Sequence, residues 1–190
     1  MKALAPMPNQ DIVVFVEEPS AYEIARAVAR KLGLLERVTV LKHQGAGDLE
    51  RSLANKIAND PFPNSKFLIL RDADNKDCRA LKRNLQERVP PAKRARTVVR
   101  IVCQELEAWY LAQPKALTSA GALARPLPRN ILNANVDAIG NPKRLFLGLA
   151  HDKGQIEHAR RIGPELDIAS TRSASFKHFV SGLRNLARMP

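Results

Sequence analysis

The chain contains few cysteines, few aromatic residues and no long apolar run, and each shortage excludes a class of protein. Among its 190 residues the cysteines are Cys78 and Cys103, and their separation fits no zinc-site spacing. So few cysteines indicate a reducing, cytoplasmic setting. Aromatic residues make up 5% of the chain, too few for an extended base-stacking surface. No stretch reaches about 18 apolar residues, so we expect no transmembrane helix and no membrane partner.

The chain is strongly basic. It carries 31 Lys and Arg against 19 Asp and Glu, a net charge of +12 that favours polyanionic partners such as nucleic acid. Residues 76–100 contribute +7 of this, from nine basic and two acidic residues. This basic segment begins two residues after Asp74, so we expect its helix and the following loop to start beside the acidic residues described below. The alternative is a solvated face that keeps the protein soluble. The residues that we expect to contact a phosphate backbone are Lys82, Arg83, Lys93, Arg94 and Arg96.

Short β-branched runs alternate with amphipathic segments of helical period, which is typical of an α/β fold. The run Ile-Val-Val-Phe-Val at 12–16 has the composition of a strand buried on both faces. We expect a mostly parallel four-stranded sheet flanked by helices in a domain over 1–120. A loop-rich and helical extension, 121–190, should pack on the same domain. Strands are expected at 11–16, 37–41, 66–70 and 97–103, and later helices at 142–149, 154–162 and 173–187.

Acidic residues follow two of the expected strands. Glu17 comes after the first strand, and Asp72 and Asp74 come after the third. Because the carboxyl ends of parallel strands share one end of a sheet, these side chains could meet at one ion. Oxygen ligands without nearby Cys or His favour Mg²⁺ or Mn²⁺. The alternative is that Asp72 and Asp74 are only turn and helix-cap residues.

Several segments together resemble a known family. The turn Val16-Glu17-Glu18-Pro19-Ser20 is similar to the Glu-Gly-Pro-Ser/Asp turn of Toprim domains, and Arg71-Asp72-Ala73-Asp74 is similar to their Asp-x-Asp turn. Toprim domains occur in topoisomerases, primases and overcoming-lysogenization-defect-type nucleases. More narrowly, the chain resembles the Toprim-like bacterial family DUF4276, some members of which are encoded beside ATPases in phage-defence loci. The segments that carry this narrower resemblance are 43–49, 71–74, 105–111 and 172–176.

The resemblance implies roles for these residues. Glu17 would be the general acid/base, and Asp72 and Asp74 would hold Mg²⁺ (or Mn²⁺). Phosphodiester cleavage needs charge neutralisation, an activated oxygen nucleophile and a proton for the leaving oxygen, and clustered carboxylates with a bound cation can supply all three. Glu18 departs from the family pattern, because many Toprim domains have Gly there. This departure weighs against polymerase-like or topoisomerase-like activity more than against metal binding.

Two further positions are candidates. On a helix, Glu105 and Glu107 would point about 200° apart, so only one can face the site. We choose Glu105 as an additional metal ligand because it is nearer the strand end; first-turn acids favoured by the helix dipole are the alternative. Arg172 could bind an anion at the start of the last helix, whereas Ser173 could simply cap that helix.

The sequence therefore predicts a metal-dependent nuclease that hydrolyses phosphodiester bonds with Mg²⁺ or Mn²⁺. The rival hypothesis is a non-catalytic module that binds nucleic acid or acts as an adaptor beside a partner ATPase. A haloacid-dehalogenase-type phosphatase is less well supported, because the Thr expected after the Asp-x-Asp is missing and Glu17 has no role in it. Divalent-metal dependence separates the first two hypotheses.

Overall fold

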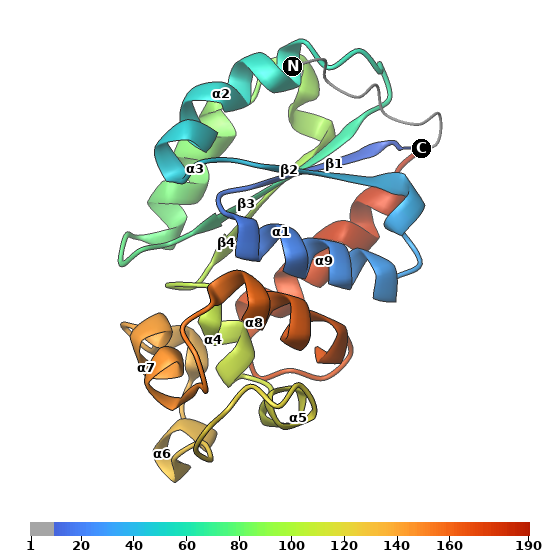
Figure 1. Ribbon diagram of the computed structural model, residues 1–190. Helices are drawn as coiled ribbons and strands as arrows, with labels where there is room; N and C mark the ends of the chain where they lie inside the picture. The colour runs from blue at the N-terminus through green and yellow to red at the C-terminus, as the bar shows by residue number, and fades with distance from the viewer. Residues whose placement is uncertain (1–9) are drawn as a thin grey trace.

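A four-stranded sheet forms the centre of the protein. The computed structural model describes residues 10–190 and places all four strands parallel, in the order β2-β1-β3-β4 (Figure 1). The α/β class and the parallel sheet expected from the sequence are confirmed. None of the helices in this part of the chain is long and apolar enough to cross a membrane. The strands are β1 (Ile12–Val16), β2 (Val38–Lys42), β3 (Lys66–Asp72) and β4 (Thr97–Val102).

Two helices cover each face of the sheet. The helices α1 (Pro19–Lys31) and α9 (Ala174–Arg188) lie on one face, and α2 (Ala46–Ala58) and α3 (Cys78–Arg88) lie on the other (Figure 1). Because successive strand residues point to opposite faces, the two central strands contribute to two cores. Val14 and Leu68 belong to the core beneath α1 and α9, whereas Phe15 and Phe67 belong to the core beneath α2 and α3.

The last helix approaches the sheet closely. A Cβ atom at Gly182 would lie 3.2 Å from Leu68 Cδ1 and 3.3 Å from Val98 Cγ1, so glycine lets α9 settle onto β3 and β4. The apolar residues of α9 recur at helical spacing and are buried, as the sequence indicated. These residues are Phe176, Phe179, Val180, Leu183 and Leu186.

The remaining helices form a group beyond the point where β4 ends (Figure 1). Within this group α4 packs on α7, and α8 packs on α1 of the sheet domain. Helices α7 and α8 lie within one residue of their expected bounds. The group consists of α4 (Glu107–Leu111), α5 (Pro114–Ser119), α6 (Arg129–Leu132), α7 (Pro142–Leu149) and α8 (Gln155–Ile162). Short 3-10 turns lie at Leu35–Arg37, Pro91–Arg96, Val136–Ala138 and Gly163–Glu165.

The strand order creates a switch point between β1 and β3. From β1 the chain moves outward to β2 on one side, and from β3 it moves outward to β4 on the other. In open parallel sheets, ligands bind at such a point, outside the carboxyl ends of the strands. The carboxyl end of this sheet, where Glu17 and Asp72 lie, is therefore where the fold favours a site.

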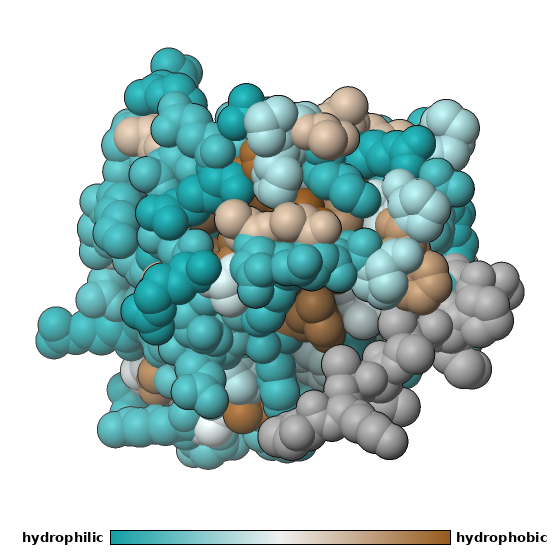
Figure 2. Space-filling view, turned by 90° about the horizontal axis from the view of Figure 1, so that it is seen from above, coloured by the Kyte–Doolittle hydropathy of each residue, from teal (hydrophilic) through white to brown (hydrophobic). Residues whose placement is uncertain are grey.

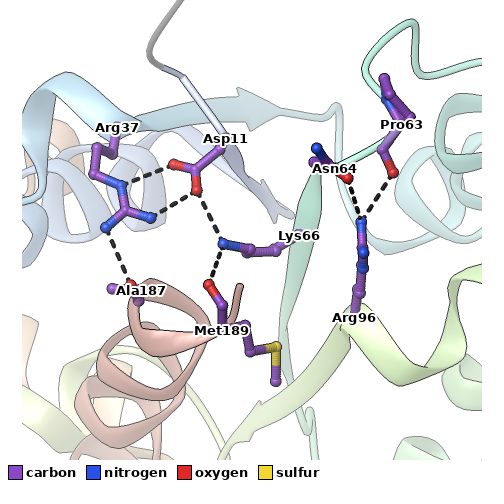
Figure 3. A network of polar contacts seen from close by, with 8 residues as sticks. All are labelled: Asp11, Arg37, Pro63, Asn64, Lys66, Arg96, Ala187 and Met189. Atoms are coloured by element: carbon purple, nitrogen blue, oxygen red, sulfur yellow. Dashed lines mark hydrogen bonds and ion pairs between the residues drawn. The ribbon is translucent and has the colours of Figure 1, made fainter.

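The opposite, amino end of the sheet is closed by paired charges (Figure 3). Asp11 accepts hydrogen bonds from Arg37 Nε at 2.9 Å and from Lys66 Nζ at 3.1 Å. Arg37 and Lys66 also donate to the backbone carbonyls of Ala187 and Met189, at 3.1 and 2.6 Å. This network ties the starts of β1, β2 and β3 to the end of α9.

Candidate functional site

Three predicted site residues lie together at the carboxyl end of the sheet. Val16 is level with Leu70 in the β1–β3 pairing, so Glu17 leaves β1 beside Arg71, and Asp72 follows at once. Asp74 lies in the turn after β3 and shares a contact with Glu17, described next. The structure thus brings Glu17, Asp72 and Asp74 to one place, on the two strands that flank the switch point.

The contact that joins them is the guanidinium of Arg71, whose side chain is 1% exposed. Arg71 Nη1 lies 2.8 Å from Glu17 Oε2 and 2.8 Å from Asp74 Oδ2, and Nε lies 3.6 Å from Glu50 Oε1. The same nitrogen, Nη1, also donates to the backbone carbonyl of Asp72. Sequence reasoning assigned Arg71 no role. The signal was present, because a charged residue at the end of an apolar strand must find partners when it is buried.

The turn after β3 has an unusual backbone. Asp74 and Asn75 have φ of 49° and 62°, and Gln104, in the turn after β4, has φ of 64°. The two turns are joined by hydrogen bonds from Asp74 N to the Gln104 carbonyl and from Asn75 N to Gln104 Oε1, both 3.0 Å long. Non-glycine residues in this region cost about 1–3 kcal/mol each and cluster at functional sites. The strain therefore supports a function for this turn.

The Asp72 carboxyl group is held among other acids. Its Oδ2 accepts a hydrogen bond from the Leu106 amide at 3.3 Å. Burial of the carboxyl group, followed by the charges of Glu18, Glu17 and Glu107, raises its pKa well above the ordinary value for Asp. Burial also raises the pKa of Glu17, although the positive charge of Arg71 opposes the shift. Such unrelieved repulsion is what a bound cation or a retained proton removes.

Of the two glutamates after β4, the structure turns Glu107 toward this cluster. Glu107 is buried, and burial raises its pKa to about 7 despite the opposing charge of Lys143. The charge of Glu107 also reaches Asp72. Glu105, the residue chosen from the sequence, instead accepts a hydrogen bond from the Lys143 amide at 3.0 Å and so caps the start of α7. That Glu105 is a metal ligand stays a prediction, and in the described structure its carboxylate is engaged at the start of α7.

A buried phenol completes the surroundings of Asp72. Tyr110 is 1% exposed, and its hydroxyl has no hydrogen-bond partner among the described residues. Burial, with the charges of Glu107, Glu18 and Asp72, raises the pKa of this phenol well above its ordinary value. An unpartnered buried hydroxyl costs about 1–3 kcal/mol. Its position beside the acids is thus an unexplained feature that a ligand would account for.

The loop after β2 supports the end of β1. Gly45, with φ of 90°, donates its amide to the Glu17 carbonyl at 3.0 Å, and His43 Nδ1 lies 2.8 Å from the Val16 carbonyl. His43 Nε2 lies 2.7 Å from Lys56 Nζ, and burial lowers the His43 pKa. This histidine is a structural residue that fixes the backbone from which Glu17 projects.

The carboxyl end of the sheet suits a divalent cation by the chemistry of its donors. In residues 10–190 no three Asp, Glu, His or Cys side chains surround one point as a preformed metal cage would. The clustered acids are nevertheless hard oxygen ligands of the kind that Mg²⁺ and Mn²⁺ take. Glu17 Oε2 is buried and, within the described chain, makes no aligned hydrogen bond, although it pairs with Arg71. These carboxylate oxygens are donors of the kind that fits a divalent cation.

The basic segment is divided between the two ends of the sheet, contrary to expectation. Helix α3 has 11 residues, or about 16 Å, and carries the chain from the carboxyl end back to the amino end. Lys93, Arg94 and Arg96 therefore lie at the amino end, away from the acids. Arg96 donates to the Pro63 carbonyl at 3.0 Å (Figure 3), and Arg94 donates to the Val89 carbonyl at 3.1 Å.

Lys82 and Arg83 are the members of that set that lie on α3 itself. Arg83 is exposed and Lys82 is half-buried. The side of the molecule on which α2 lies is covered mostly by hydrophilic residues, with small apolar patches between them (Figure 2). That these two basic residues of α3, and Lys93, Arg94 and Arg96 at the other end of the sheet, contact a phosphate backbone stays a prediction.

The comparisons with known proteins agree with this geometry. A family model described as "Domain of unknown function (DUF4276)" matches residues 3–184. The chain belongs to the DUF4276 family. No curated protein matches it.

Solved structures resemble this DUF4276 chain over nearly its whole length. The C-terminal region of the Xanthomonas campestris pv. campestris OLD protein is 18% identical, with a TM-score of 0.56 over 95% of this chain and 98% of that one. The C-terminal region of the Burkholderia pseudomallei OLD protein is 13% identical, with a TM-score of 0.56 over 93% and 98%. These likenesses show the fold alone: the parallel α/β architecture expected from the sequence is shared with the C-terminal regions of OLD proteins.

Arg172, predicted to bind an anion, performs a different task in this DUF4276 chain. Its guanidinium donates to the carbonyls of Leu111 and Leu132, both at 2.6 Å, and to that of Ile131 at 3.1 Å. It thus joins the carboxyl ends of α4 and α6, whose last carbonyls have no partner within their own helices. These carbonyls engage the guanidinium in the described structure, and anion binding by Arg172 stays a prediction.

The neighbouring serines also hold the fold together. Ser173 caps α9 by accepting from the Phe176 amide at 3.1 Å, and it donates to Asp137 at 2.7 Å. Ser175 accepts from Trp109 Nε1 at 2.8 Å, and Trp109 is fully buried. The segments 105–111 and 172–176, which carry the family resemblance, therefore meet inside the molecule and join the helical group to α9.

Proposed function

We propose that this DUF4276 protein hydrolyses phosphodiester bonds of nucleic acid with Mg²⁺ or Mn²⁺ at the carboxyl end of its sheet. The observation that carries the proposal is the meeting of Glu17 with the Asp72 and Asp74 turn at the switch point. The net charge of +12 supports a polyanionic substrate. The fold likeness to the C-terminal regions of OLD proteins and the Toprim resemblance support the same reaction.

The acids divide into a proton carrier and cation ligands. Glu17, whose pKa burial raises, can keep a proton for the leaving oxygen or accept one from the attacking water. Asp72 is the central ligand, and Asp74 and Glu107 are its acidic neighbours. Glu107 is better placed than Glu105, which the Lys143 amide holds. A divalent cation bound there supplies charge neutralisation at the phosphate and an activated oxygen nucleophile.

Residues around the acids hold them in position. Arg71 fixes the carboxylates of Glu17 and Asp74, and the Leu106 amide fixes that of Asp72. Gly45 fixes the backbone of Glu17. Positioning of this kind restricts the groups to the reactive arrangement before a substrate arrives.

The test measures cleavage of single-stranded and duplex DNA and RNA, with Mg²⁺ or Mn²⁺ and with a chelator. We expect cleavage that requires the metal and is lost in Glu17→Gln and Asp72→Asn. Glu36→Gln, at an exposed acid in the 3-10 turn before β2 at the amino end of the sheet, removes the same charge away from the site and is the matched control. Equal rates in all three variants, or cleavage that survives chelation, would contradict the proposal.

One observation favours the rival function. Arg71 already pairs with Glu17 and Asp74, so these two carboxylates are partly neutralised without any metal. A module that binds nucleic acid, or an adaptor beside a partner ATPase, would need no metal ion in addition to this arginine. Tight, salt-sensitive binding with no turnover under any metal would favour this second candidate.

A further inference from the structure

The Arg71 guanidinium is a buried positive charge among the proposed site carboxylates. Arg71 contacts two of these carboxylates, and its side chain is 1% exposed. Removing a charge from water so completely is costly, so such a group is retained only with close partners. The inference below rests on the proposed function, because it concerns the ion that this function requires.

One nitrogen of Arg71 stands between the two carboxylates. Nη1 is 2.8 Å from Glu17 Oε2 and 2.8 Å from Asp74 Oδ2, so it bridges β1 and the turn after β3. A metal ion joining the same two oxygens would have to occupy the same space. The guanidinium is held there by Glu50, 3.6 Å from Nε, and by the Asp72 carbonyl.

The other part of the acidic cluster has no such arginine. Asp72 lies within the electrostatic reach of Glu18 and Glu107, and the Tyr110 hydroxyl beside them has no partner in the described chain. Glu107 is buried, and the Arg71 guanidinium pairs with Glu17, Asp74 and Glu50 but not with Glu107. This part therefore offers carboxylate oxygens without a bridging guanidinium, and the hydrogen bonds that Glu18 and Asp72 accept come from Ser20 and from the Leu106 amide.

We propose that Arg71 is a built-in cation that bridges Glu17 and Asp74, so that the site binds a single divalent ion, on the side of Asp72, Glu18 and Glu107. Asp74 then serves mainly to hold Arg71, and Asp72 is the ligand on which binding of the ion depends most. Arg71 is a positioning residue in this scheme, since it keeps Glu17 in place beside the ion.

The decisive measurement is the number of Mn²⁺ ions bound per chain, followed by the electron paramagnetic resonance signal of free Mn²⁺ and by calorimetry on the full chain. We expect one ion in the native protein and two in Arg71→Gln, where the Glu17–Asp74 position becomes available. Arg88→Gln removes a charge that contacts Glu50 at 3.7 Å but neither site carboxylate, and should still bind one ion.

Two ions in the native protein, or one in a folded Arg71→Gln variant, would overturn the inference and leave the proposed function standing. No ion in the native protein would contradict the metal assignment itself, and the inference with it. If Arg71→Gln does not fold, the inference is tested on the native protein and on Arg71→Lys. Arg71→Lys keeps the charge, so both proteins should bind one ion.

Affinity provides an independent check. Asp72→Asn should weaken Mn²⁺ binding by more than the roughly 10–100-fold that is typical of residues outside the first ligand shell. Asp74→Asn should weaken it by less than this, because Asp74 binds Arg71. Equal losses in the two variants would place Asp74 on the ion and overturn the inference.

Discussion

The two ends of the sheet differ in how far their acidic side chains are paired with basic ones. At the amino end, Asp11 is bound by Arg37 and Lys66, and the hydrogen bond from Arg37, despite partial burial, lowers the Asp11 pKa. At the carboxyl end, acids outnumber their partners, and burial raises the pKa of Glu17, Asp72 and Glu107. The paired charges at the amino end stabilise the fold. The acids at the carboxyl end repel one another, and a bound cation would reduce that repulsion.

The difference is also visible in the backbone. The amino-end network uses carbonyls at the end of a regular helix, α9, as its acceptors (Figure 3). The carboxyl end contains the left-handed residues Asp74, Asn75 and Gln104. Strain and excess charge thus occur together, on the side of the sheet where the fold favours a ligand.

The largest effect should follow from Asp72→Asn. Metal-dependent cleavage should fall by at least about 100-fold, because an oxygen ligand loses its charge. The free energy of unfolding at pH 7 should rise, because a buried carboxylate held against its neighbours is removed while an amide oxygen can still accept from Leu106. Cleavage rates and urea unfolding of the same preparation measure both. A variant that loses stability and keeps activity would reverse the comparison.

Asp11→Asn should show the opposite behaviour. Lys66, with a side chain 5% exposed, would lose its charged partner, and Arg37 would lose its ion pair. We expect the free energy of unfolding to fall by about 1–3 kcal/mol, in line with hydrogen bonds to charged groups, with cleavage unchanged at temperatures where the variant is folded. Asp60→Asn, at another surface acid, is the control. A loss of cleavage in fully folded Asp11→Asn would mean that the two ends are coupled.

The dependence of stability on pH should separate the two ends. A carboxyl group with a raised pKa binds its proton more tightly in the folded state, so ionisation between the ordinary pKa of 4.5 and about 7 destabilises the fold. For Glu107 the loss over this range is at most roughly 3 kcal/mol, and Glu107→Gln should reduce the decline. Asp11, with a lowered pKa, contributes stability above its unfolded pKa, and that contribution disappears as the pH falls through the folded pKa. Thermal unfolding from pH 3 to 8 measures both; identical profiles for the native protein and Glu107→Gln would refute the assignment.

The smallest effect concerns nucleic-acid affinity. Lys82 and Arg83 lie on α3, whereas Arg94 and Arg96 are held at the amino end by backbone carbonyls. Replacing Lys82 and Arg83 by Ala should weaken binding and reduce the salt slope by about 0.7–0.9 for each phosphate that these side chains neutralise in the native protein. The pair Arg94→Ala and Arg96→Ala removes the same charge and should change the slope less. Equal slopes in both double variants would show that binding responds to net charge alone.

Much of the architecture was predictable because it depends on local patterns. The apolar run of β1 and the repeating apolar residues of α1 and α9 carry their period in the sequence. The helical segments between successive strands make a parallel sheet the natural arrangement. The placement of Glu17 and Asp72 at one end followed from the same rule, since every parallel strand ends on the same side. Ser173 as the cap of α9 was a local signal of the same kind.

Other residues could not be assigned from neighbours in the sequence. Choosing between Glu105 and Glu107 required the direction in which the chain leaves β4. The contacts of Arg172 with the carboxyl ends of α4 and α6 were not visible in the sequence, because these helices are distant from it along the chain. The basic segment was continuous in the sequence, but α3 carries its second half to the far end of the sheet.

The sequence by itself determined the strand and helix periods, the excess of positive charge and the acidic turns, because these depend on residue type and spacing over a few residues. Only the tertiary structure decided which charges become partners, because that depends on burial and on contacts between distant segments. Arg71 illustrates the division: its position before Asp72 is plain in the sequence. Its bridge between Glu17 and Asp74 exists because β1 and β3 lie side by side and exclude water from the guanidinium.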